Sequence, residues 1–178
     1  MTTVSQILNR LRALGLTDKT WFNAIWFQST WFSCVLGRDA LLPLTLTLLA
    51  LHFILVDSAR EEARQLLPIV AIGVGVDTLL SVIGIFDFGS VLVPLWLMAL
   101  WVAFAASLTR ALGVFGRSRV LAAFVGGLGV PFNYAVGAKM GAVALPMDPI
   151  VTGAVLIATW AMLLPALYQI TKPIVSSR

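Results

Sequence analysis

The sequence predicts an all-α integral membrane protein, a bundle of about six transmembrane helices preceded by a short amphipathic N-terminal helix. Of its 178 residues, 60% are hydrophobic and 11% are charged, whereas ordinary soluble domains contain roughly 25% charged residues. Apolar runs of about 18 or more residues recur along the chain, and each could carry a helix across the ~30 Å hydrocarbon core. We expect helices because a helix satisfies its own backbone hydrogen bonds in lipid.

Residues 1–20 form the first predicted unit, because they are too polar to cross a membrane. Their apolar residues recur at helical spacing: Val4, Ile7, Leu8, Leu11 and Leu14. Arg10 and Arg12 lie off that stripe, which predicts an amphipathic helix in the membrane interface. A frayed cytoplasmic tail is the alternative interpretation.

Residues 21–178 form the second predicted unit, a single six-span transmembrane domain. The predicted spans are residues 21–37, 40–57, 66–86, 91–110, 119–138 and 149–170. The connections between them are short and leave no room for a soluble domain. In the connection 58–65, Glu61 and Glu62 lie between Arg60 and Arg64, and we predict a solvated turn there. We expect the tryptophans mostly to anchor the spans at the membrane surface or to pack between helices, with Trp101 and Trp160 deep enough to line a site.

The distribution of positive charge predicts the orientation. With the N-terminus inside, ten of the twelve Lys and Arg residues, Lys172 and Arg178 among them, fall in cytoplasmic segments. Only Arg38 and Lys139 fall outside, which is the bias expected for six spans with both termini in the cytoplasm. Because this rule accounts for the net charge of +4, we expect no binding to nucleic acid.

Asp77 is the residue that most strongly suggests function. It lies near the middle of the apolar run 66–86, and about 2.5–3.5 kcal/mol is needed to place such a charge at the centre of a membrane helix. At ~1.5 Å per residue, Trp101 comes out at a similar depth, with Gln28 and Asn133 about 5 Å to either side. A protonated Asp77 that only joins helices is the structural alternative.

Two stripes of small residues accompany these polar groups. Gly73, Asp77 and Ser81 share one face of the third span, and a run of glycines with Asn133 shares one face of the fifth. We predict that both stripes face the interior of the bundle. Asn133 and Gln28 then have two interpretations, hydrogen bonds between helices or contact with a ligand.

Span five contains the segment from Gly126 to Pro131, which is a poor helix interior. Either a kink in a continuous helix or an interrupted helix, as in transporter substrate sites, would account for it. His52 is predicted to lie roughly 9 Å shallower than Asp77, too far for a direct pair. No motif for a metal or a cofactor is present in the sequence, so we predict neither.

Four clusters together resemble a known family. They are Asn23-x4-Gln28-x2-Trp31, Asp77-Thr78-Leu79-Leu80, Pro94-x-Trp96-x4-Trp101-x2-Phe104 and Pro131-x2-Tyr134-x2-Gly137. The chain resembles the bacterial multi-pass membrane family filed as domain of unknown function 2878. The resemblance implies an inner-membrane protein without an assigned activity, and it suggests a lipid-linked accessory role. It also carries over the candidate positions Asn23, Gln28, Asp77, Trp96, Trp101 and Tyr134, without catalytic assignments.

Three functional hypotheses remain. The preferred one is a non-enzymatic accessory module of lipid or envelope metabolism, whose partners are the bilayer, a membrane enzyme or a second copy bound through glycine-rich helix faces. The second is a small-molecule or proton-coupled transporter with Asp77 at a mid-membrane site. The third, an intramembrane enzyme acting on a lipid, is disfavoured because no second catalytic group comes within reach of Asp77.

Overall fold

The structure, a computed structural model, describes residues 3–176, and of residues 4 and 172–176 it describes the backbone alone. The side chains of Val4 and Lys172, and Arg178 as a whole, therefore lie outside the described residues. The predicted all-α membrane fold is confirmed. In the part of the chain that is described, the longer helices are α1 Val4–Ala13, α2 Thr20–Phe32, α3 Leu42–Leu55, α4 Ala59–Val82, α5 Leu95–Leu108, α6 Arg119–Lys139 and α7 Pro149–Ser176.

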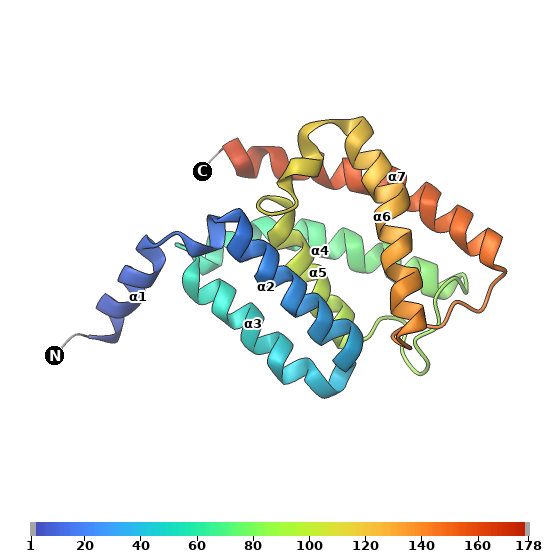
Figure 1. The fold of residues 1–178 in the computed structure, drawn as a ribbon, viewed down its shortest axis with the longest axis horizontal. Helices are drawn as coiled ribbons and strands as arrows, with labels where there is room; N and C mark the ends of the chain where they lie inside the picture. Colours follow the sequence, from blue (N-terminus) through green and yellow to red (C-terminus); the bar gives the residue numbers. More distant parts are fainter. Residues whose placement is uncertain (1–2, 177–178) are drawn as a thin grey trace.

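Each of the helices α2 to α7 overlaps one predicted span. Among the described residues, four helical segments are long and apolar enough to cross a membrane: Thr20–Leu55, Ala59–Val82, Arg119–Lys139 and Pro149–Thr171. The first of them contains two helices, α2 and α3, which run back along each other (Figure 1) through a π-helical turn and a 3-10 turn over 33–41. The α5 helix is apolar but shorter.

The α5 helix forms the centre of the bundle. It packs against α2, α3 and α4, and small buried residues such as Ala103 and Ala106 let these neighbours approach closely. Its 14 residues span only ~21 Å at 1.5 Å per residue. A helix this short fits the interior because protein, rather than lipid, surrounds it.

The α6 and α7 helices pair into a hairpin beside this centre (Figure 1). Gly126 and Gly127 make the close approach possible, because a Cβ at Gly126 would overlap the backbone carbonyl of Trp160. The α6 helix continues through Pro131 to Lys139. Of the two interpretations of span five, the structure therefore supports the continuous helix.

The α4 helix differs from the predicted span at both ends. It begins at Ala59, where the Ser58 hydroxyl accepts a hydrogen bond from the amide of Glu61, so the predicted solvated turn is helical instead. It ends at Val82 because Gly84 adopts a positive φ of 80°, a left-handed conformation that suits glycine at a helix terminus. The residues between Val82 and α5 form a loop that holds the buried side chains of Ile85 and Phe86.

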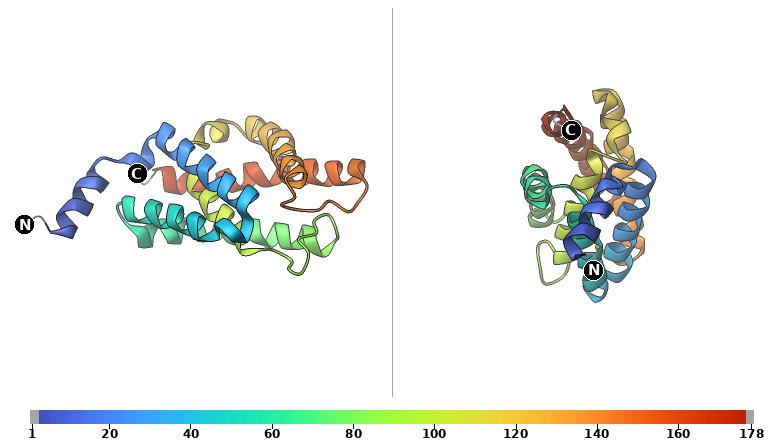
Figure 2. Two further views of the ribbon diagram at one scale, coloured as in Figure 1. Left: turned by 60° about the horizontal axis from the view of Figure 1, so that its bottom comes forward. Right: turned by 90° about the vertical axis from the view of Figure 1, so that its left-hand side faces the viewer.

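The α1 helix extends away from the bundle (Figure 2). Its last turn contacts the end of α3, where the guanidinium of Arg12 donates a hydrogen bond to the carbonyl of Ile54. Ile7, Leu11 and Leu14 stay exposed. An exposed apolar stripe beside basic residues is compatible with a position in the membrane interface, which stays a prediction.

Candidate functional site

Asp77 is completely buried, and both of its carboxylate oxygens accept hydrogen bonds. The indole Nε1 of Trp101 on α5 donates to Oδ2 at 2.7 Å, and the phenol of Tyr134 on α6 donates to Oδ1 at 2.8 Å. Three helices thus meet at one carboxyl group. The similar depths estimated for Asp77 and Trp101 agree with this contact.

The two donors are held by tight packing. The Trp101 ring lies flat on Gly73, where a Cβ would overlap it, and it stacks on Trp160 of α7 with the ring planes 8° apart. Tyr134 stacks on Phe86 from the loop after α4, at a centroid distance of 4.6 Å. Glycine at position 73 is therefore what lets α5 bring an indole to Asp77.

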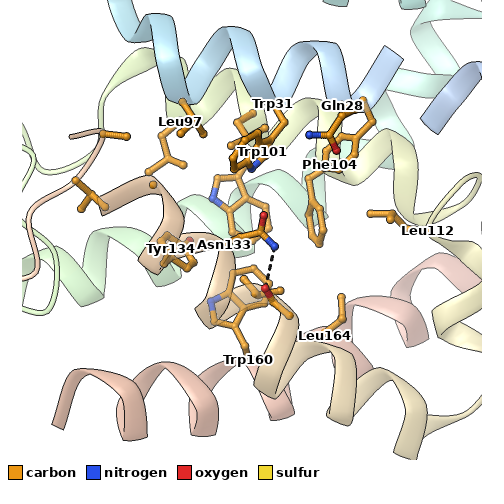
Figure 3. A pocket seen from close by; sticks show the side chains of 18 of the residues that line it. Gln28, Trp31, Leu97, Trp101, Phe104, Leu112, Asn133, Tyr134, Trp160 and Leu164 are labelled. Atoms are coloured by element: carbon orange, nitrogen blue, oxygen red, sulfur yellow. Dashed lines mark hydrogen bonds between the residues drawn. The ribbon is translucent and has the colours of Figure 1, made fainter. Parts of the chain in front are cut away.

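A cavity of about 300 Å³ lies next to this cluster, between α2, α5, α6 and α7 (Figure 3). Its size falls at the lower end of the range for small-molecule sites. Its wall is unusually aromatic: Phe27, Trp31, Phe88, Trp96, Trp101, Phe104, Phe115, Tyr134, Trp160 and Tyr168. Four of the six tryptophans line this cavity. Trp101 and Trp160 were predicted to be deep enough to line a site, whereas Trp31 and Trp96 were expected to be anchors or packing residues.

Gln28 on α2 and Asn133 on α6 line the same cavity, among the aromatic rings (Figure 3). The amide nitrogen of Asn133 donates to the carbonyl of Gly129 on its own helix. The hydrogen bonds of the described residues include none from Gln28 or Asn133 to another helix. The structure therefore does not support these two amides as hydrogen-bonding links between helices.

Ser81 and Asn23 lie apart from the carboxyl group of Asp77. The Ser81 hydroxyl bonds to the backbone carbonyls of Asp77 and of Leu92, so it ties α4 to the loop. The buried Asn23 accepts a hydrogen bond from the amide of Ala111, beyond the end of α5. Ala111 follows Trp101 by ten residues, which corresponds to ~15 Å at the helical rise.

A charged cluster that the sequence analysis missed lies at the same end as Asn23. Glu62, predicted to be solvated, is only 4% exposed, so that prediction is wrong. Its carboxylate accepts two hydrogen bonds from the guanidinium of Arg110, at 2.8 and 3.1 Å, and Oε1 lies 3.0 Å from Nε2 of His52. The pairing of Arg110 with Glu62 depends on the helical extension of α4, which the charge pattern alone does not reveal.

The rest of this cluster ties the ends of the helices together. Trp26 stacks on the imidazole of His52 at 4.6 Å, and Arg110 also bonds to the exposed carboxylate of Asp18, at 3.1 Å. As predicted, His52 does not pair with Asp77. The guanidinium of Arg110 is buried and bonds to Glu62, to Asp18 and to the carbonyl of Ala106, so the cluster joins the ends of several helices.

The wall of the cavity is aromatic and uncharged. None of its lining residues is charged, and Asp77 lies behind Trp101 and Tyr134 with both oxygens occupied. Within residues 3–176, no group of three or more His, Cys, Asp and Glu side chains is placed to hold a metal ion. What the wall offers a ligand is aromatic surface, two carboxamides and the indole N–H of Trp160, which has no hydrogen-bond partner among the described residues.

Comparison with known proteins identifies the family of this chain. Residues 20–166 match the model of the family described as "Protein of unknown function (DUF2878)". The chain belongs to this family. The match covers α2 through most of α7 and so includes Asp77 and most of the residues that line the cavity. No curated protein and no solved structure matches the chain.

Proposed function

We propose that the protein is a non-enzymatic accessory module of lipid or envelope metabolism that holds a lipid-like molecule in its aromatic cavity. The cavity is the observation that carries this proposal. An uncharged aromatic wall suits an apolar ligand, since burying apolar surface contributes roughly 25 cal/mol per Å². The absence of charged residues from the cavity wall argues against acid–base chemistry there.

The cellular setting is part of the same proposal. We place the protein in a bacterial cytoplasmic membrane with both termini in the cytoplasm, on the strength of the uneven distribution of Lys and Arg. A membrane enzyme that supplies or consumes the bound lipid would be its partner, with self-association as the alternative.

Lipid retained through purification tests the proposal. Gly129 lines the cavity, and a Cβ added there would lie 3.8 Å from its nearest neighbour, a methyl carbon of Val125, so a leucine at this position would fill the cavity. We expect Gly129→Leu to lose at least half of the lipid that mass spectrometry finds in the native protein. Gly75→Leu is the control, because position 75 is exposed with open space around it. Equal lipid content in all three proteins would refute the proposal.

A transporter coupled to Asp77 is the second candidate, and one observation favours it. Trp101 and Tyr134 both line the cavity and both donate to Asp77, so a proton on Asp77 would alter the cavity wall. This hypothesis requires ligand affinity to depend on pH, and it requires Asp77→Asn to remove that dependence while the protein stays folded. A flat pH profile in the native protein would exclude the coupling.

A further inference from the structure

The cavity has an asymmetry that bears on the ligand it accepts. Among its lining residues, only Gln28 and Asn133 carry a side-chain amide, and none carries a charge. Both residues line the cavity and both are exposed rather than buried. By the depth estimate they lie about 5 Å to either side of the membrane midplane, where water is scarce.

An amide in such a place needs a hydrogen-bond partner. Transfer of an unpaired amide into an apolar environment is unfavourable by roughly 2–7 kcal/mol. One N–H group of Asn133 donates a hydrogen bond to the carbonyl of Gly129. The side-chain oxygen of Asn133 takes no part in this bond. The described hydrogen bonds give Gln28 no partner within the protein, so both its donors and its acceptor are available to an occupant of the cavity.

The chemistry of these groups selects the ligand, and we infer that the cavity binds an uncharged lipid whose polar group is a hydroxyl, held by the carboxamide of Gln28 or of Asn133. This inference rests on the proposed function and specifies its ligand. A hydroxyl both donates and accepts, as does a carboxamide. A carboxylate or a phosphate would meet no cation among the lining residues. A quaternary ammonium would be attracted by the aromatic faces, but it has no hydrogen-bond donor or acceptor and would leave the carboxamides unpaired.

The volume limits the apolar part of the ligand. At about 300 Å³, the cavity lies at the lower end of the range for small-molecule sites. The ligand is therefore a medium-length alcohol, or a longer hydroxyl-bearing lipid with part of its chain in the bilayer.

A matched series of brominated probes tests the inference in detergent solution. The probes share an eleven-carbon chain and differ at one end: 11-bromoundecanol, 11-bromoundecanoic acid, (11-bromoundecyl)trimethylammonium and 1-bromoundecane. Bromine quenches tryptophan fluorescence at short range, and four of the six tryptophans line the cavity. Affinities are expressed per mole fraction of probe in the micelle, and the part of the quenching that Gly129→Leu abolishes is taken as specific.

We expect bromoundecanol to bind about two- to tenfold more tightly than bromoundecane, because one neutral hydrogen bond contributes about 0.5–1.5 kcal/mol. The double variant Gln28→Leu/Asn133→Leu should bind both probes equally. Gln169→Leu is the control, because Gln169 lies on α7 outside the cavity lining and the preference for the alcohol should persist.

The outcomes separate this inference from the proposed function. Specific quenching by bromoundecane that equals that by the alcohol would overturn the hydroxyl assignment and leave an apolar lipid site. Tighter binding of the acid or of the ammonium probe would also overturn it. If no probe gives quenching that Gly129→Leu removes, both the inference and the lipid-binding proposal fail.

Discussion

Trp101 donates a hydrogen bond from its indole to the carboxylate of Asp77 at 2.7 Å, although the two residues lie 24 positions apart on different helices. The contact joins the buried acid to the cavity wall, since the indole packs against both Gly73 and Trp160. Asp77 thereby fixes the orientation of an aromatic ring that a ligand would touch.

Removal of one donor from this cluster should destabilise the protein. Tyr134→Phe leaves Oδ1 of Asp77 buried without its partner, and we expect a loss of about 1–3 kcal/mol in the free energy of unfolding. In an Asp77→Asn background the same substitution should have a smaller effect, because the carboxylate is already gone. Reversible unfolding in mixed micelles measures both values. Equal losses in the two backgrounds would show that the two side chains are not coupled.

The buried pair of Glu62 and Arg110 should contribute more to the free energy of unfolding than an exposed ion pair does. Arg110→Met removes a guanidinium from a buried carboxylate, and we expect a destabilisation of about 3 kcal/mol, as for other broken buried pairs. Asp18→Asn, which changes a carboxylate that is 60% exposed, should change stability by less than about 1 kcal/mol. Thermal unfolding of the two variants side by side provides the test. A larger effect at Asp18 would contradict the burial of Glu62 and Arg110.

Close packing within the α6 and α7 hairpin should make Gly126 intolerant of a methyl group. Gly126→Ala places a Cβ against the Trp160 carbonyl, and forcing the helices apart should destabilise the protein by about 1–3 kcal/mol. Gly75→Ala has open space around it and should be neutral or stabilising by up to about 1 kcal/mol. The difference between the two variants, rather than either value alone, is the quantity to measure. Identical melting temperatures would argue against the hairpin contact.

The orientation inferred from charge can be measured directly. Reporter fusions to the N-terminus and to the C-terminus should both be active on the cytoplasmic side. A fusion in the loop between α6 and α7, near Lys139, should report the opposite side. Activity of the two terminal fusions on different sides would overturn the six-span arrangement.

The sequence allowed the arrangement of helices to be predicted because hydrophobic length is a strong signal in membrane proteins. Each predicted span overlaps a helix, and the common depth of Asp77 and Trp101 followed from apolar runs and helical rise alone. The ends of α4 were predicted less accurately. The cap at Ser58 and the left-handed conformation of Gly84 depend on one or two residues, and these residues lie within longer polar or apolar runs.

Side-chain partners were harder to predict for a physical reason. Depth gives one coordinate of a residue, but contact also depends on the rotation of each helix, so Tyr134 rather than its neighbour Asn133 reaches Asp77. The pairing of Glu62 with Arg110 depends on the same rotation. A signal for it was present in the sequence, because an acid four residues beyond a capping serine is in the first helical turn and need not be solvated.

The enclosed position of α5 has a consequence for biogenesis. The α5 helix has only 14 residues and has neighbours on several sides. During translation, before those neighbours are present, so short a helix is poorly retained in lipid. The α5 helix would then reach its native position only after the flanking segments have inserted. Chains halted soon after Leu112 should be the preferred substrates of membrane quality-control proteases.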